Sequence, residues 1–158
     1  MTDEELLEEL HFLGIDEGSY MVVALLPLVQ VGWADGRIQS KEHAVIEGAA
    51  RQRGLLAGDG ARILHSWLSH PPTYEYQERG RQVLVELARR RGDMGQEFTL
   101  DTLDEILELC EAVAAAAGGL FGIIGRVEDS EREAIAEIAH SLDVARSVTW
   151  EELAAELE

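Results

Sequence analysis

Apolar side chains recur along most of this chain at the three-to-four-residue spacing of an amphipathic helix, and no segment alternates clearly as a half-buried strand would. Thr2 with Glu5 has the spacing of a capping box, which marks a helix start. The pattern predicts helices from Thr2 to near Gly14, over Tyr20–Ala34, after Ser40 as far as Gly54, over about Gly60–Leu68, over 74–91, from Thr99 to Ala117, after Ser130 to Leu142, and over 150–158.

The segment Tyr20–Ala34 is apolar almost all round, which is typical of a central buried helix. Ser19 is in place to cap it, and Pro27 is expected to kink or divide it because proline cannot donate the helical hydrogen bond. The helices after Ser40, Thr99 and Ser130 each carry one apolar stripe, formed by Val45, Ile46, Ala49 and Ala50; by Leu103, Ile106, Leu107, Cys110, Val113, Ala114 and Ala117; and by Ile135, Ile138, Ala139 and Leu142. These stripes predict an all-α fold, a single compact bundle of about seven to eight helices in one domain spanning residues 1–158.

A shift of 89 positions brings two parts of the chain into register. Gly36-Arg37-Ile38 then lies over Gly125-Arg126-Val127, and Glu42 lies over Glu131. The apolar stripes of the two following helices coincide as well. We interpret the bundle as two degenerate helix-loop-helix repeats, with halves at about 20–55 and 103–145. The glycine-rich stretch 114–127 is then the second copy of a helix end and its turn.

The formal net charge of −18 argues against non-specific nucleic-acid binding and against anionic membrane surfaces, and it is compatible with cations or basic partners. No apolar stretch is long enough to span a bilayer, and the acidic N-terminus does not resemble a signal peptide, so we expect a cytoplasmic protein. Cys110 is the only cysteine and lies in an apolar stripe, which predicts a buried, inert thiol.

The loop WADGRIQSKE has part of the spacing of a twelve-residue calcium-binding loop, with Gly36 at the sixth position and Glu42 at the twelfth. Val31 and Trp33 occupy the first and third positions and cannot ligate a cation, which excludes a seven-coordinate calcium loop. A weaker divalent-cation site for Ca²⁺ or Mg²⁺ remains open, with Asp35, Glu42, Glu128 and Glu131 as candidate ligands. The simpler alternative is a turn in which the Asp35 carboxylate accepts loop N–H groups near Arg37 and Ile38.

This loop resembles the Ala-Asp-Gly signature of the tellurite-resistance TerB-like family, in which an aliphatic residue, three further residues and a Glu follow. The motif residues are Asp35, Gly36, Ile38 and Glu42, then Gly125, Val127 and Glu131, with Ile124 where a second Asp would stand. The resemblance implies a bacterial, all-helical, two-repeat domain that is associated with metal or oxyanion stress. It also implies a divalent-cation site on the acidic loops and no established catalysis.

We therefore expect a non-catalytic binding or scaffolding module with protein partners. One alternative is a purely structural interaction domain that binds no metal. A carboxylate-dependent metal hydrolase is a remote alternative, because few acidic residues lie on apolar faces. The arginines at 79–91 either bind a phosphate or an acidic partner, or pair with the acidic helices of the same chain. The second reading is favoured in so acidic a sequence.

Overall fold

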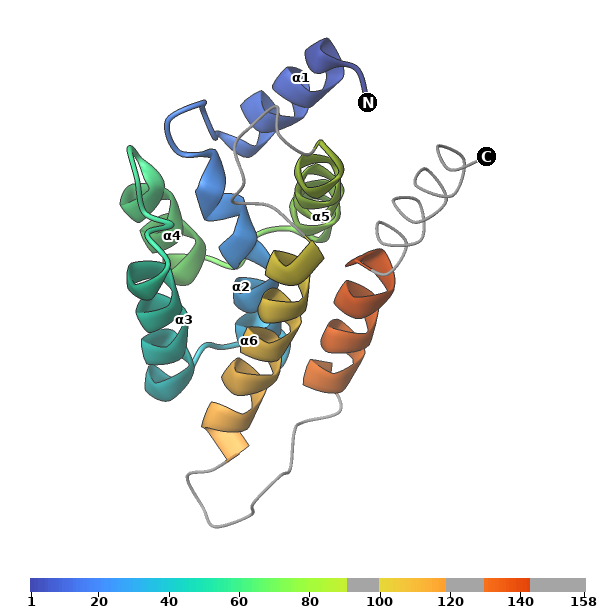
Figure 1. Cartoon of the computed structure of the whole chain (residues 1–158). Helices are drawn as coiled ribbons and strands as arrows, with labels where there is room; N and C mark the ends of the chain where they lie inside the picture. Colours follow the sequence, from blue (N-terminus) through green and yellow to red (C-terminus); the bar gives the residue numbers. More distant parts are fainter. Residues whose placement is uncertain (91–99, 119–129, 143–158) are drawn as a thin grey trace.

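The computed structural model describes residues 1–90, 100–118 and 130–142, and within these ranges the chain is helical with no strand (Figure 1). The elements are α1 (Asp3–Leu13), the 3₁₀ helix η1 (Tyr20–Leu25), α2 (Leu26–Trp33), α3 (Ser40–Gln52), α4 (Gly60–Ser69), α5 (Tyr74–Arg89), α6 (Leu100–Gly118) and a last helix over 130–142. The all-α bundle predicted from the hydrophobic pattern is confirmed. The helix predicted over 150–158 lies outside the described residues.

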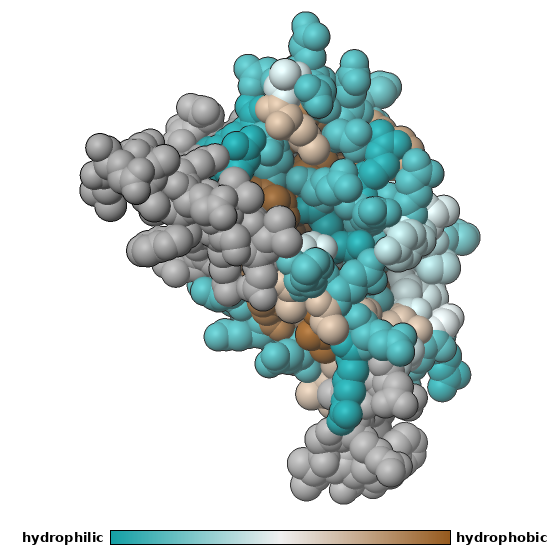
Figure 2. Space-filling model, turned by 90° about the vertical axis from the view of Figure 1, so that its right-hand side faces the viewer, coloured by the Kyte–Doolittle hydropathy of each residue, from teal (hydrophilic) through white to brown (hydrophobic). Residues whose placement is uncertain are grey.

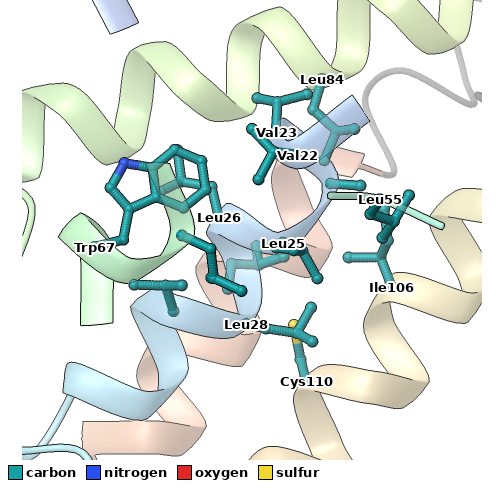
Figure 3. Packing of buried hydrophobic residues seen from close by; sticks show 14 of the residues in the cluster. Val22, Val23, Leu25, Leu26, Leu28, Leu55, Trp67, Leu84, Ile106 and Cys110 are labelled. Carbon is teal, nitrogen blue, oxygen red and sulfur yellow. The ribbon is translucent and has the colours of Figure 1, made fainter. Parts of the chain in front are cut away.

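Proline divides the central segment, as its covalent chemistry requires. Tyr20–Leu25 is a 3₁₀ helix, and the α-helix begins at Leu26 with Pro27 in its first turn, where a missing N–H costs no helical bond. Every residue from 22 to 29 is buried. Figure 3 shows Leu25 and Leu28 of this segment facing Ile106 and Cys110 of α6. The central segment is thus the hub of the core, and α2 packs against α3, α5 and α6.

Most helix ends follow the local signals. The Thr2 hydroxyl accepts from Glu5 N–H at 3.1 Å, and the Glu5 carboxylate accepts from Thr2 N–H at 3.4 Å. Two details differ from expectation. Ser19 does not cap η1, because its hydroxyl donates to the Asp16 carboxylate at 2.7 Å instead. Ser40 is the first residue of α3, and Gln39 takes the capping position.

Most of the predicted inward face of α6 is confirmed, because Leu103, Ile106, Cys110, Val113 and Ala114 are buried. Leu107 is only half-buried, and the side chain of Ala117 lies outside the described part of the structure. The acidic residues on the other side of α6 are exposed: Asp104, Glu105, Glu108 and Glu111. The helix over 130–142 is rotated slightly from the expected stripe. It buries Ala134, Ile138 and Leu142, while Ile135 and Ala139 are half-buried.

Figure 1 shows that the turn between α2 and α3, which carries Asp35 and Gly36, lies at one end of the bundle. Helices α2 and α6 pack together and run in the same direction, and α3 and residues 130–142 run back the opposite way. Figure 2 shows that the face on the side of residues 130–142 is largely hydrophilic where it is described. Among the described helices, none is long and apolar enough to cross a membrane.

Candidate functional site

The turn between α2 and α3 is shaped by Asp35 and Gly36. The Asp35 side chain is exposed, and its Oδ1 accepts from Arg37 N–H at 3.3 Å. Gly36 has φ +99°, in the left-handed region that favours glycine, and its N–H donates to Trp33 O at 2.8 Å. The Asp-mediated turn expected from the sequence is therefore present.

The turn then closes tightly over the end of α2. The Ile38 side chain lies against Gly32, where an added Cβ would come within 3.2 Å of Ile38 Cγ1 and 3.5 Å of Ile46 Cδ1. A side chain at position 32 would therefore require the Ile38 side chain to move by a few tenths of an ångström. This close contact packs the turn between α2 and α3 against α2.

Glu42 lies beneath that turn and is completely buried, with 0% of its surface exposed. One carboxylate oxygen, Oε1, accepts from Gln39 N–H at 3.0 Å, as in a capping box. The other oxygen, Oε2, is buried and has no hydrogen-bond partner. A buried carboxylate oxygen without a donor is costly, because its hydration has been lost and not replaced.

The pKa of Glu42 is raised to about 7, chiefly by burial and also by the negative charge of nearby Asp35, against the opposing effect of the Gln39 hydrogen bond. The N-terminus of α3 favours a carboxylate, but one favourable end is not enough to offset full burial. In chemical terms, Glu42 needs either a proton or a cation near Oε2.

Of the other two candidate ligands, the structure describes Glu131 but not Glu128. Glu131, the repeat equivalent of Glu42, is also buried, with 1% exposed, in the first turn of the helix over 130–142. Glu128 and the second loop, including Gly125 and Val127, lie outside the described residues. In the described part of the chain, no three His, Cys, Asp or Glu side chains are grouped as a metal site. His43, which follows Glu42 in the sequence, lies beside Glu47, with its Nδ1 3.6 Å from Glu47 Oε1.

The arginines of α5 that the structure describes pair within the chain, as the sequence favoured. Arg79 makes two bonds to Glu9, at 2.8 and 2.9 Å, and its guanidinium lies 3.5 Å from the centroid of the Phe12 ring. Arg89 and Arg90 both pair with Glu86. Because these guanidinium groups already have carboxylate partners, this helix is a poor phosphate site.

One polar network was missed by the sequence reasoning. Arg81, only 4% exposed, donates to Gln30 Oε1 at 2.5 Å and to Glu137 Oε1 at 2.8 Å. Tyr74 donates its hydroxyl to the same Glu137 oxygen at 2.7 Å. Arg81, Tyr74 and Glu137 line a cavity of about 360 Å³ between α5 and the helix over 130–142. The available signal was Gln30, a polar residue in an otherwise apolar helix.

Comparison with known proteins finds no match to this chain among family models, curated proteins or solved structures. The resemblance to the TerB-like family therefore depends on the WADGRIQSKE loop and its weaker second copy.

Proposed function

We propose that this protein is a non-catalytic helical binding module whose first loop binds one divalent cation through Glu42 and Asp35. The observation that carries the proposal is the buried Glu42 carboxylate, whose Oε2 has no donor and which lies near a second carboxylate. A cation there would replace the missing donor and would offset the repulsion between the two negative charges. The TerB-like motif supports the same residues and suggests a role in metal or tellurite stress.

The chemistry of the two ligands favours Mg²⁺ over Ca²⁺. Magnesium keeps several water molecules and is commonly held by only one or two carboxylates, whereas calcium takes about six to eight oxygen ligands. The alternative calcium site would need further oxygens from the second loop. Catalysis is not proposed, because metal-assisted hydrolysis requires a wider set of inward polar groups around the ion than Asp35 and Glu42 supply.

Calorimetric titration of EDTA-treated protein with Mg²⁺, Ca²⁺, Mn²⁺ and Zn²⁺ tests the proposal. We expect one ion per chain with submillimolar affinity, and affinity roughly tenfold weaker, about 1.4 kcal/mol, in Glu42→Gln and in Asp35→Asn. Glu47→Gln is the matched control, because it removes one carboxylate from the same helix at a partly exposed position. Its affinity should equal that of the unmodified protein.

The contrary results are equally defined. Binding no tighter than millimolar in the unmodified protein, or equal binding in all three variants, would overturn the cation site. A purely structural interaction domain would then be the better description, with no effect of metal on the melting temperature. Glu131→Gln, tested in parallel, shows whether the second repeat contributes a ligand to the same ion.

A further inference from the structure

A second feature with binding character lies at α1, on the helix that caps the bundle. A cavity of about 660 Å³ is bounded by α1, the turn that follows it and Arg90. Its apolar lining includes the buried Leu6, Leu10 and Ile15 and the exposed Leu7. Concave apolar surface of this size is within the range that ordinarily holds ligand or partner side chains.

Leu7 is an apolar residue that lies outside the buried face of α1. The core stripe of α1 is Leu6, Leu10 and Leu13, and each of these is 4% exposed. Leu7 is 63% exposed and borders the cavity. A single exposed leucine is ordinary on a protein surface, but one that borders a leucine-lined cavity extends its apolar surface outward.

Most charged side chains around this apolar surface are acidic. Glu4 and Glu8 are exposed on α1, and Asp16 and Glu17 are exposed in the turn that follows. Asp16 and Glu17 also line the cavity. Two basic side chains, His11 and Arg90, also line the cavity, and Arg90 is already bound to Glu86, Asp3 and the carbonyl of Met1. A partner therefore meets an apolar groove with an acidic rim.

We propose that this groove, defined by Leu6, Leu7, Leu10 and Ile15 with its rim of Glu4, Glu8, Asp16 and Glu17, binds an amphipathic helix with a basic face from a partner protein. Apolar side chains of that helix would contact Leu7 and enter the cavity, and its lysines or arginines would lie against the rim. A second copy of this chain fits poorly, because each of the two chains carries a net charge of −18. An anionic membrane is disfavoured for the same reason.

This inference names a partner class for the binding module and does not depend on the cation site. The probe is a synthetic peptide of about 18 leucine and lysine residues, five helical turns, with the leucines on one face. The control peptide has the same composition with leucines spread around the helix. Fluorescence anisotropy at low and moderate salt measures both affinities for the full chain.

We expect the amphipathic peptide to bind at least roughly tenfold more tightly than its control, and Leu7→Ser to remove most of that difference. Glu8→Gln with Glu17→Gln should weaken binding and reduce its salt dependence. Glu47→Gln with Asp59→Asn, two partly exposed acids on α3 and beside α4, is the charge-matched control. It should bind like the unmodified protein.

Thermal melts should show that Leu7→Ser is folded, because Leu7 is exposed. Equal affinity for the two peptides, or binding unaffected by Leu7→Ser, would overturn the proposal. Self-association that requires Leu7 without peptide binding, seen by sedimentation, would also overturn it in favour of a second copy. Because Glu42→Gln leaves α1 untouched, that variant should bind the peptide normally whether or not the cation site exists.

Discussion

At the scale of the residue, the burial of the Glu42 carboxylate is an unusual feature with a large expected effect on stability. Its backbone position is ordinary, because a carboxylate in the first turn of a helix is electrostatically favoured. Its burial is not ordinary, because the side chain is fully covered and only one of its oxygens is hydrogen-bonded. Most proteins avoid this arrangement unless a proton or a cation completes it.

The pH dependence of stability follows from this burial. Because the pKa of Glu42 is raised in the folded state to about 7, from its ordinary value of 4.5, the folded chain holds a proton between these pH values that the unfolded chain releases. The stability contributed by protonated Glu42 is complete below the lower value and is lost as pH rises through the higher one. In EDTA, Glu42→Gln should therefore raise the free energy of unfolding at about pH 8 by roughly 1–3 kcal/mol, with little change at about pH 4.

Urea unfolding across this pH range measures the effect. Because the Glu47 carboxylate is partly exposed, Glu47→Gln should leave the dependence of the unfolding free energy on pH parallel to that of the unmodified protein. If Glu42→Gln also gives a parallel profile, Glu42 is not the buried acid that governs stability here.

At the scale of the element, local signals account for most helix ends, and tertiary contact constrains one of the turns between helices. Gly14 follows α1 with φ +74°, and an added Cβ would meet nothing within 4 Å. Gly58 has a similar φ of +59°, but an added Cβ would lie 2.7 Å from the carbonyl oxygen of Gly18. The turn before α4 therefore packs directly on the turn between α1 and η1.

Comparing Gly14→Ala with Gly58→Ala separates these two causes. Gly14→Ala should cost about 1–2 kcal/mol, which is the penalty of a left-handed conformation for an L-residue. Gly58→Ala should cost about 1–3 kcal/mol more, because the backbone of the other turn must also move. Chemical denaturation gives both values, and equal losses would show that the two turns are not in tight contact.

At the scale of the whole molecule, Arg81 joins parts of the chain that are distant in sequence. It connects α5 to Gln30 on α2 and to Glu137 on the helix over 130–142. Gln30 also donates to Glu137, at 3.4 Å. The last described helix is thus held by polar bonds as well as by the buried Ile138 and Leu142.

A double-mutant cycle of Arg81→Met and Glu137→Gln measures this connection. We expect a coupling energy of about 1–3 kcal/mol, below the largest values for buried pairs because Glu137 is partly exposed. The exposed pair Arg62–Asp59 is the control, and its coupling should lie near zero, at most about 0.5 kcal/mol. Similar coupling in both pairs would show that the Arg81 network does not hold the bundle together.

The sequence by itself determined where the described helices lie, most of the inward faces of α3 and α6, and that Cys110 is a buried thiol. These features depend on spacings of three to four residues, on caps and on proline, all of which are local. It also identified the Asp35 turn and marked Glu42 as a residue of interest.

Only the tertiary structure decided how deeply Glu42 is buried, that Arg79 pairs with Glu9, and that Arg81 meets Gln30 and Glu137. It also decided that Leu7 borders a cavity instead of lying alone on a polar surface. These outcomes depend on which helices pack together across 50 to 100 residues of sequence. No local pattern encodes that choice, because an amphipathic helix specifies that one face is buried but not against what.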